Sequence, residues 1–265
     1  MSGDTPLLAV PNISEGRDRT LVERVVADPS LIDLHVDPDH NRSVATYAGH
    51  ADTLVTAMTR LVERAIEHLD LGLHTGAHPR FGVVDVMPFV PYDADIAIAR
   101  GAADRAATAI EDRGVPVHRY GDGAVELPVL RRTLREPHDA HPTAGVVCIG
   151  VRGPLVAFNV NLRATLTEAR RIAATLRGPH VRALGFALPS RELAQVSMNL
   201  IDPRSLGPMD AFERIEQGGT EIVDAEIVGL LPDGLEATLA AIPLRTPVRT
   251  VGEALGRPPS HRSAI

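Results

Sequence analysis

The sequence predicts an α/β (α+β) protein of two similar subdomains, each a mixed sheet of split β-α-β-β-α-β type with helices on one face. Short β-branched runs that end at Pro or Gly predict strands, and apolar residues at helical spacing predict the helices between them. Both halves of the chain repeat the same order of elements. We expect an N-terminal subdomain at 1–144, a C-terminal subdomain at 145–250 and a mobile tail at 251–265.

The first half is predicted to run strand, helix, strand, strand, helix, strand, helix, strand. Its strands are short runs rich in Val, Ile and Leu. The second helix has the clearest periodicity, since Leu54, Met58, Leu61 and Ala65 fall on one face at helical spacing. In order, the elements span 7–11, 17–27, 31–36, 43–48, 52–69, 83–90, 94–113 and 117–120.

A connection rich in Pro, Arg and His (121–145) leads to the second half. We expect strands at 146–151, 155–162, 182–187, 194–200 and 221–229, and helices at 165–176, 209–217 and 235–241. Thr165 or Thr167 is expected to cap the first of these helices, with Glu168 in its first turn. Two subdomains imply a cleft between them, which is a favoured place for a ligand.

The composition excludes several classes of protein. The 265 residues are 44% hydrophobic and 23% charged, as in ordinary globular proteins. A net charge of -7, an aromatic fraction of 3% and the absence of Trp disfavour nucleic-acid binding. No run approaches roughly 18 apolar residues, so no membrane partner is expected and the cytoplasm is the expected location. The single cysteine, Cys148, excludes an intramolecular disulfide and is expected to be a buried hydrophobe.

The chain contains no lysine, so all 27 Lys+Arg residues are arginine. Schiff-base chemistry and a P-loop lysine are therefore excluded. Anions must be bound by arginine forks, which match planar carboxylates. Histidine, with 11 copies, is the abundant group that titrates near neutrality.

The densest polar cluster is His74-Thr75-Gly76-Ala77-His78-Pro79-Arg80-Phe81-Gly82. Its Gly and Pro residues disfavour a helix, and Pro79 biases His78 toward extended backbone. One interpretation is a solvated surface loop, and another is general acid–base chemistry by histidine. A third is a metal site in which the His pair joins Asp37, Asp39 or Asp85.

Two further loops of the first half carry polar groups. Residues 37–42 read as a good turn, but Asp37, Asp39, Asn41 and Arg42 also offer carboxylates, an amide and a guanidinium to a substrate. The loop at 11–16, which contains Asn12, is most simply a loop that caps the following helix.

In the second half, amide side chains alternate along two predicted strands, so they share a sheet face. Such a face suits hydrogen bonding to a polar ring, or it covers an exposed surface. These residues are Asn159 and Asn161 on one strand and Gln195 and Asn199, with Ser197, on the other.

Taken together, these motifs resemble the glutamate formimidoyltransferase family, including the transferase part of the formimidoyltransferase-cyclodeaminases. The similarity follows the family's order over nearly the whole chain. The matching stretches are 10–16, 37–42, 76–91, 150–162, 194–200 and 226–230.

The resemblance implies a homodimer that binds tetrahydrofolate, as co-substrate, in a tunnel between the subdomains. The implied reaction of histidine degradation moves a formimino (or formyl) group from N-formimidoyl-L-glutamate to the 5-nitrogen of tetrahydrofolate, with no resident metal. His78 maps onto the catalytic histidine and is expected to act as general base. The folate-contacting segment maps onto residues 137–145, with Pro137, His141, Pro142, Thr143 and Gly145. Arg42, Arg80 and Arg152 are expected to bind substrate carboxylates, and the Asn and Gln faces to hold the pterin.

The chain also departs from the family pattern. Ala77 replaces a Glu before the catalytic histidine, Leu73 replaces a basic residue, and the connector at 121–136 is shorter and has Leu134-Arg135-Glu136 where Asp-Phe-Gly is customary. Loss of the carboxylate beside His78 is expected to change the pKa or orientation of that histidine. Two alternatives therefore stay open: a diverged, non-catalytic protein that binds a folate-like ligand, and a metal-assisted hydrolase.

Overall fold

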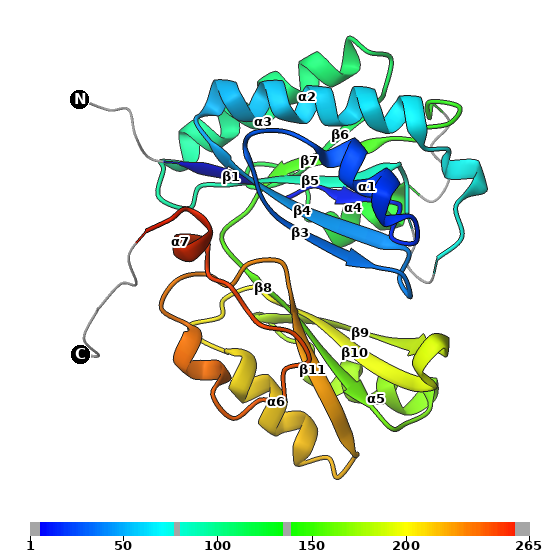
Figure 1. Ribbon diagram of the computed structural model, residues 1–265, viewed down its shortest axis with the longest axis vertical. Coiled ribbons are helices and arrows are strands. Elements are labelled where there is room, and N and C mark those ends of the chain that lie inside the picture. Colours follow the sequence, from blue (N-terminus) through cyan, green and yellow to red (C-terminus); the bar gives the residue numbers. More distant parts are fainter. Residues whose placement is uncertain (1–5, 77–79, 135–138, 258–265) are drawn as a thin grey trace. The chain divides into compact units, whose positions relative to one another are not determined.

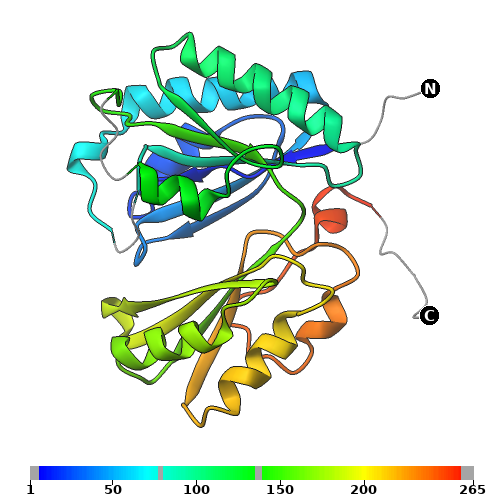
Figure 2. The same cartoon turned by 180° about the vertical axis from the view of Figure 1, so that it is seen from behind.

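The computed structural model describes residues 6–76, 80–134 and 139–257, and the chain divides into two compact units, Met1–Gly153 and Pro154–Ile265. Each unit has its own hydrophobic core. Figures 1 and 2 show both units as α/β structures, in accord with the predicted fold class. Within the described residues, no helix is long and apolar enough to cross a membrane.

The first unit is built on a seven-stranded sheet. β1 and β2 follow one another between β4 and β5, because each pairs antiparallel with both neighbours. β3 lies beyond β4, and β7 and β6 extend the sheet parallel to β5. The strands are β1 (Leu7–Ala9), β2 (Asn12–Ile13), β3 (Leu31–Asp37), β4 (Arg42–Gly49), β5 (Val84–Val90), β6 (Val117–Gly121) and β7 (Val147–Val151).

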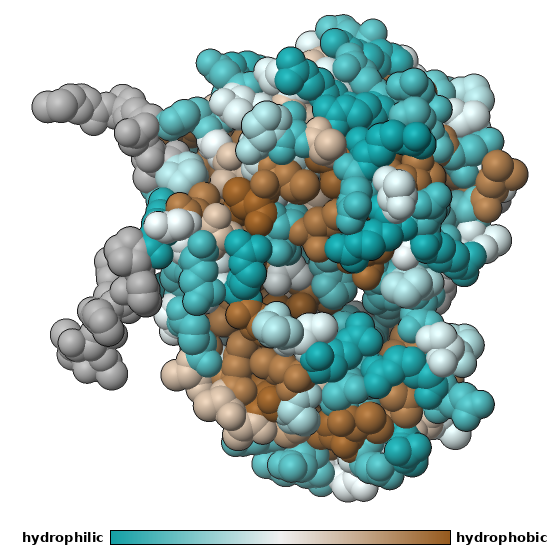
Figure 3. All heavy atoms as spheres, in the orientation of Figure 1, coloured by the Kyte–Doolittle hydropathy of each residue, from teal (hydrophilic) through white to brown (hydrophobic). Residues whose placement is uncertain are grey.

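The helices of the first unit cover both faces of this sheet. α1 (Arg19–Val26), α2 (Ala51–His68) and α3 (Ile96–Glu111) pack their apolar sides on one face, as predicted. Asp18 and Asp95 begin α1 and α3 by accepting hydrogen bonds from the backbone amides of Leu21 and Ala97. In Figure 3, hydrophilic residues predominate on the surface around α1 and α2, as their amphipathic sequences require.

A short helix that the sequence analysis did not predict, α4 (Leu127–Thr133), lies on the opposite face (Figures 1 and 2). Leu130 of α4 packs with Val86, Tyr120 and Cys148 in a separate small core. Cys148 is buried, as predicted, and burial raises the pKa of its thiol to about 12. The spacing of Leu127, Leu130 and Leu134 is that of a helix face, so the signal for α4 was present in the sequence.

The strand predicted at 146–151 is β7, and it belongs to a different sheet from the one expected. We expected that strand in the second half of the chain, but it pairs with β5 and β6 in the first sheet, and the two units divide after Gly153. Every residue of β7 is buried, which is typical of a central parallel strand covered on both faces. Periodicity alone cannot reveal which sheet such a strand joins.

The second unit has the β-α-β-β-α-β order, and its antiparallel sheet has the strand order β11-β8-β10-β9. Its elements are β8 (Val156–Leu162), α5 (Leu166–Leu176), β9 (Val181–Leu188), β10 (Leu193–Leu200), α6 (Pro208–Glu216) and β11 (Ile222–Val228). Both helices pack on one face against alternate residues of the strands, such as Phe158 and Val196. Thr165 caps α5, as predicted, by accepting from the Glu168 amide.

Short helical turns complete the chain: η1 (Leu71–Leu73), η2 (Pro189–Arg191), η3 (Glu236–Leu239) and α7 (Val251–Ala254). η3 replaces the helix expected at 235–241. α7 begins in the segment expected to be a mobile tail, where Thr250 and Glu253 form a capping box and Val251 is buried. Residues 258–265 of that predicted tail lie outside the described residues.

Candidate functional site

The polar residues of the first unit converge on Asp85, at the beginning of β5. Its carboxylate is 1% exposed, and its Oδ2 lies 2.5 Å from Nη2 of Arg131 and 3.5 Å from Nη1 of Arg42. Its Oδ1 accepts from the backbone amide of Phe81 at 3.0 Å. Asp85 therefore contacts α4, β4 and the loop before β5 at the same time. The sequence pattern indicated Asp85 only as a metal ligand and did not indicate Arg131.

Arg42 joins this cluster to the first loop of the chain. Its Nε and Nη2 donate to Oδ1 of Asn12 at 3.1 and 2.7 Å. The two residues meet because Asn12 pairs with Val44 in the sheet, one strand away from Arg42. Burial lowers the pKa of Arg42, and the nearby charge of Arg131 lowers it further.

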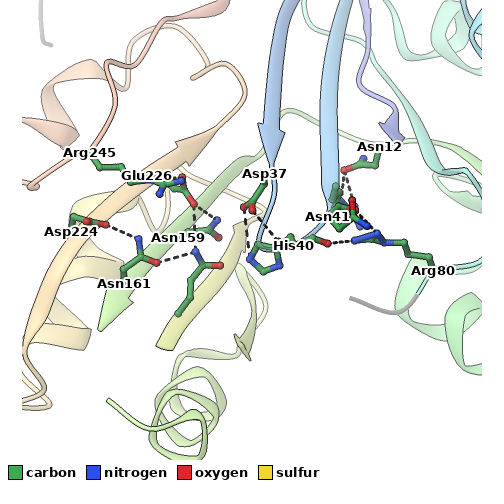
Figure 4. Close-up of polar contacts among 12 residues, drawn as sticks. Asn12, Asp37, His40, Asn41, Arg80, Asn159, Asn161, Asp224, Glu226 and Arg245 are labelled. Atoms are coloured by element: carbon green, nitrogen blue, oxygen red, sulfur yellow. Dashed lines mark hydrogen bonds and ion pairs between the residues drawn. The ribbon is translucent and has the colours of Figure 1, made fainter. Parts of the chain in front are cut away.

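Arg80 is held by the turn between β3 and β4. It donates from Nη1 to the carbonyl of Asn41 at 2.8 Å and from Nη2 to the carbonyl of His40 at 2.5 Å. Figure 4 shows the guanidinium directed at this turn. Burial, followed by the charge of Arg42, lowers the pKa of Arg80 to about 10. Arg42 and Arg80 therefore lie near each other, and their predicted role in binding substrate carboxylates stays a prediction.

The turn itself uses Asp37 and Asn41 for its own backbone. Asp37 accepts from the His40 amide at 2.9 Å, and Asn41 adopts a left-handed φ of 48°. Oδ1 of Asn41 accepts from the Gly16 amide at 2.9 Å. Gly16 is required there because a Cβ would lie 2.2 Å from the Asp37 carbonyl. Asp39 is half-buried and makes no hydrogen bond or ion pair with the described residues.

His74 accepts a hydrogen bond from the cluster. Its Nε2 lies 2.5 Å from Nη1 of Arg80, which can only donate. Burial and then the charge of Arg80 lower the pKa of His74, so the imidazole is neutral at neutral pH. His78 lies outside the described residues, but the residues on either side of 77–79, Gly76 and Arg80, are both next to His40 and His74.

The segment that ends at Gly145 lies beside this loop. His141 and Gly145 exchange backbone hydrogen bonds at 2.9 Å, and Nδ1 of His141 accepts from the amides of Thr143 and Ala144. Leu71 and Val83 donate to the carbonyls of Thr143 and Ala144 at 2.8 and 2.9 Å. Pro142, within this turn, is exposed, and Pro137 lies outside the described residues. The segment expected to contact folate is thus adjacent to the histidine loop.

Arg152 is not part of the cluster. It follows the last residue of β7, opposite Val90 by the strand register, whereas Asp85 is near the start of β5. The two positions are five residues apart along the strand direction, or about 17 Å. Arg152 donates to the Gly153 carbonyl, and burial lowers the pKa of its guanidinium.

The second unit holds a separate polar network on the sheet face opposite its helices. Asn159 donates to Oε1 of Glu226 at 3.0 Å, and Asn161 donates to Oδ1 of Asp224 at 2.6 Å. Gln195 joins the Asn161–Asp224 pair to the Asn159–Glu226 pair, because it donates to Oδ1 of Asn161 at 3.0 Å and to Oε1 of Glu226 at 3.4 Å. Figure 4 shows Asn161 directed at Asp224, and Asn159 and Arg245 converging on Glu226.

Two arginines complete this network. Arg245 donates to Oε2 of Glu226 from both Nε (2.8 Å) and Nη2 (2.5 Å), and Arg191 donates to Asp224 from Nη2 at 2.6 Å. None of these four charged residues was expected from the sequence to be a site residue. Asn199 has the same parity as Gln195 but is exposed and pairs with Arg182 and Ala157 near the end of β10, away from the network.

The described side chains of this cluster do not favour a metal centre. Among the described residues, no three His, Cys, Asp or Glu side chains are grouped to hold an ion. The Nε2 of His74 and the Oδ2 of Asp85 already face arginine donors. A guanidinium would repel a cation at either position.

Comparison with known proteins agrees with the fold and with the order of the motifs. Residues 7–152 match the formiminotransferase domain, N-terminal subdomain, and residues 157–243 match the formiminotransferase domain. The chain belongs to the formiminotransferase family. Its enzyme class is therefore transferase, as the sequence analysis predicted.

Relatives in this family come from bacteria, archaea and animals. The glutamate formimidoyltransferase of Streptococcus pyogenes serotype M1 is 32% identical, over 84% of this chain and 88% of the relative. That of Thermoplasma acidophilum is 33% identical, over 84% and 87%. The formimidoyltransferase-cyclodeaminase of Sus scrofa is 33% identical over 88% of this chain and 51% of its own length.

The formiminotransferase matches contain nearly all of the polar groups described above. The N-terminal match includes the whole cluster around Asp85, with Arg131, and the second match includes the network around Asn161 and Glu226. Arg245 follows the second match by two residues.

Proposed function

We propose that this formiminotransferase moves a formimino group from N-formimidoyl-L-glutamate to the 5-nitrogen of tetrahydrofolate, with His78 as general base. Tetrahydrofolate is then a co-substrate, and a homodimer is the expected assembly. The names of the relatives and the motif match at His78 support the reaction. The structural observation that supports it best is the arginine-rich cluster beside the His78 loop, since both substrates carry glutamate carboxylates.

The proposed chemistry requires two proton transfers. Attack by the folate nitrogen forms a bond to the formimino carbon and gives a tetrahedral adduct, while His78 accepts the proton from that nitrogen. The bond from the carbon to the glutamate nitrogen then breaks, and the proton passes to the departing amine. The products are formimino-tetrahydrofolate and glutamate. The proton removed from folate is the one that glutamate receives, so no other reactant is needed.

Several of the other site residues keep a proposed role that their contacts allow. The neutral His74 holds Arg80 in place, and His141, Thr143 and Gly145 shape the turn proposed to contact folate. Asn159 donates from Nδ2 to Glu226, so its Oδ1 is the group available to a pterin N–H. Arg152 lies apart from Asp85 and would bind a different carboxylate from the one at the cluster.

The test is a coupled measurement of turnover and binding. Purified protein is mixed with tetrahydrofolate and N-formimidoyl-L-glutamate, and the product is followed by absorbance. The variant is His78→Ala, and His180→Ala, an exposed histidine, is the control. We expect the first substitution to abolish most turnover and the control to retain it. Turnover that survives His78→Ala would contradict the general-base role.

The alternative of a diverged binding protein predicts a different result from the same preparation. Tetrahydrofolate would bind in calorimetry, but no product would form. Ala77 and the exposed Leu73, which stand where the family pattern has a carboxylate and a cation, are the features that favour this alternative.

A further inference from the structure

Two guanidinium groups in the first unit contact a single carboxylate, and a third lies near them. Arg131 and Arg42 both approach Oδ2 of Asp85, and Arg80 adds a third positive charge, which is close enough for Arg42 and Arg131 to lower its pKa. Oδ1 of Asp85 is occupied by the Phe81 amide. Among the described residues, the other direct partners of the three arginines are amide and carbonyl oxygens and one neutral imidazole. Glu15 adds a second negative charge near Arg80, so three positive charges face two negative charges.

Among the described residues, three donors of this cluster lack a hydrogen bond, although one of them, Nη1 of Arg42, faces Oδ2 of Asp85 in an ion pair at 3.5 Å. Nη1 of Arg42, Nε of Arg80 and Nε of Arg131 are buried, and none makes a hydrogen bond with the described residues. Arg131 donates to Asp85 from Nη2 alone, whereas Arg42 and Arg80 each use two nitrogens. A buried donor without an acceptor costs free energy, and an excess of buried like charge adds to that cost. An anion at the partly exposed edges of Arg42 and Arg131, whose side chains are 20% and 19% exposed, would offset the excess positive charge.

Arg131 is also held rigidly. It follows Leu130, which packs against Val86, Tyr120 and Cys148, so the helix that carries it is anchored to the sheet. Its guanidinium carbon lies 6.0 Å from the centroid of the Phe81 ring, within the range of a cation–π contact. Preorganisation of this kind lowers the entropy lost when a ligand binds.

We propose that Asp85 holds Arg42 and Arg131 as a preformed site for an amino-acid carboxylate, and that Arg131 determines specificity for the glutamate end of a substrate. The planar fork of arginine matches a carboxylate in shape and charge. The anion site follows from the cluster itself, whereas the choice of glutamate rests on the proposed function. The carboxylate comes either from the formimino donor or from the glutamate tail of folate.

The test measures binding without turnover. L-Glutamate and p-aminobenzoyl-L-glutamate are each titrated by calorimetry, at low ionic strength, into wild type, Arg131→Gln and Arg132→Gln. Arg132 is the exposed neighbour on the same helix and serves as the matched control. We expect Arg131→Gln to weaken binding of at least one of the two compounds about 10-fold to 100-fold, the loss that goes with one charged hydrogen-bonding partner. Arg132→Gln should stay within about twofold of wild type, since an exposed charge contributes little.

The compound that loses affinity identifies the source of the carboxylate. Loss with L-glutamate assigns the site to the formimino donor, and loss with p-aminobenzoyl-L-glutamate alone assigns it to folate. Equal affinities of wild type and Arg131→Gln for both compounds, or no binding of either to wild type, would overturn the proposal. Thermal unfolding of each variant shows whether it is folded, and Arg131→Lys, which keeps the charge, should recover part of the affinity in a folded protein.

Failure of the carboxylate site can be distinguished from failure of the proposed reaction. If the wild-type enzyme turns over and Arg131→Gln leaves both KM values unchanged, the reaction stands and the site is wrong. If no turnover occurs but carboxylate binding depends on Arg131, the site stands and the reaction is wrong.

Discussion

Arg80 donates from Nη1 to Nε2 of His74 across 2.5 Å, so this ring nitrogen carries no proton. A protonated imidazole would direct an N–H at a guanidinium that has no acceptor. The contact links the loop that contains His78 to the turn that contains Asn41, because Arg80 also donates to the Asn41 carbonyl. The neutrality of His74 is therefore a structural requirement of the cluster, and it has a consequence for stability.

The folded protein should lose stability as the pH falls below about 6.5, the ordinary pKa of histidine. Folding lowers the pKa of His74, through burial and then the charge of Arg80, so the unfolded chain binds more protons in this range. The free energy of unfolding then falls with decreasing pH until the pH is below the folded pKa. In urea denaturation at about pH 7.5 and about pH 5.5, His74→Gln should lose less stability than wild type. His180→Gln should lose as much as wild type, and an identical loss in His74→Gln would contradict the assignment.

Asp85→Asn should destabilise the first unit by about 3 kcal/mol, because it leaves Arg42 and Arg131 without their shared counter-charge. The amide is nearly the same size, so the loss reports charge and not packing. Asp104→Asn, which removes the exposed partner of Arg119, is the control and should cost less than about 1 kcal/mol. Chemical denaturation measures both, and equal losses would show that Asp85 is not the counter-ion of a buried cluster.

Glu226→Gln should destabilise the second unit by about 3 kcal/mol and also weaken tetrahydrofolate binding. Glu226 is 1% exposed and accepts from Asn159, Gln195 and Arg245, so the substitution disturbs the amides proposed to hold the pterin. Glu221→Gln, at an exposed pair with Arg163 just before β11, should change neither quantity measurably. Unchanged folate affinity in a folded Glu226→Gln protein would separate this network from the binding site.

Gly145→Ala should be far more damaging than Gly123→Ala, although both glycines have positive φ angles of 71° and 78°. The left-handed backbone costs alanine about 1 kcal/mol at either position. At Gly145 a Cβ would also lie 2.1 Å from the Phe81 carbonyl, whereas nothing lies within 4 Å at Gly123. The clash should add at least about 2 kcal/mol, measured by thermal or urea unfolding. Equal losses would show that the turn at 141–145 relaxes freely.

Most of the secondary structure was predictable because apolar periodicity records which side of each element is buried. The predicted helices at 52–69 and 165–176 differ from α2 and α5 by one residue at each end, or by less. The strand at 7–11 was less accurate, since β1 ends at Ala9 and β2 begins at Asn12. α4 was overlooked because its residues lie in a stretch judged by its Pro and Arg content.

The candidate site was predictable in part. Asn12, Arg42 and Arg80 fall in predicted loops between apolar elements, which is where binding residues concentrate. The structure brings them together, although it places Asn12 in β2 and Arg42 at the start of β4. Arg131 lay in a connection that was judged by its Pro and Arg content. Glu226 lay in a predicted strand, where a charge is typical of a solvated face.

The sequence by itself determined the order of helices and strands, the repeat of the β-α-β-β-α-β unit and the family, since these depend on local periodicity and on motifs read along the chain. Only the tertiary structure decided that β7 completes the first sheet and that Arg42 and Arg131 share the carboxylate of Asp85. The physical reason is that charges pair according to strand order and helix placement. Hydrophobic burial sets that arrangement over the whole unit, and no short stretch of sequence records it.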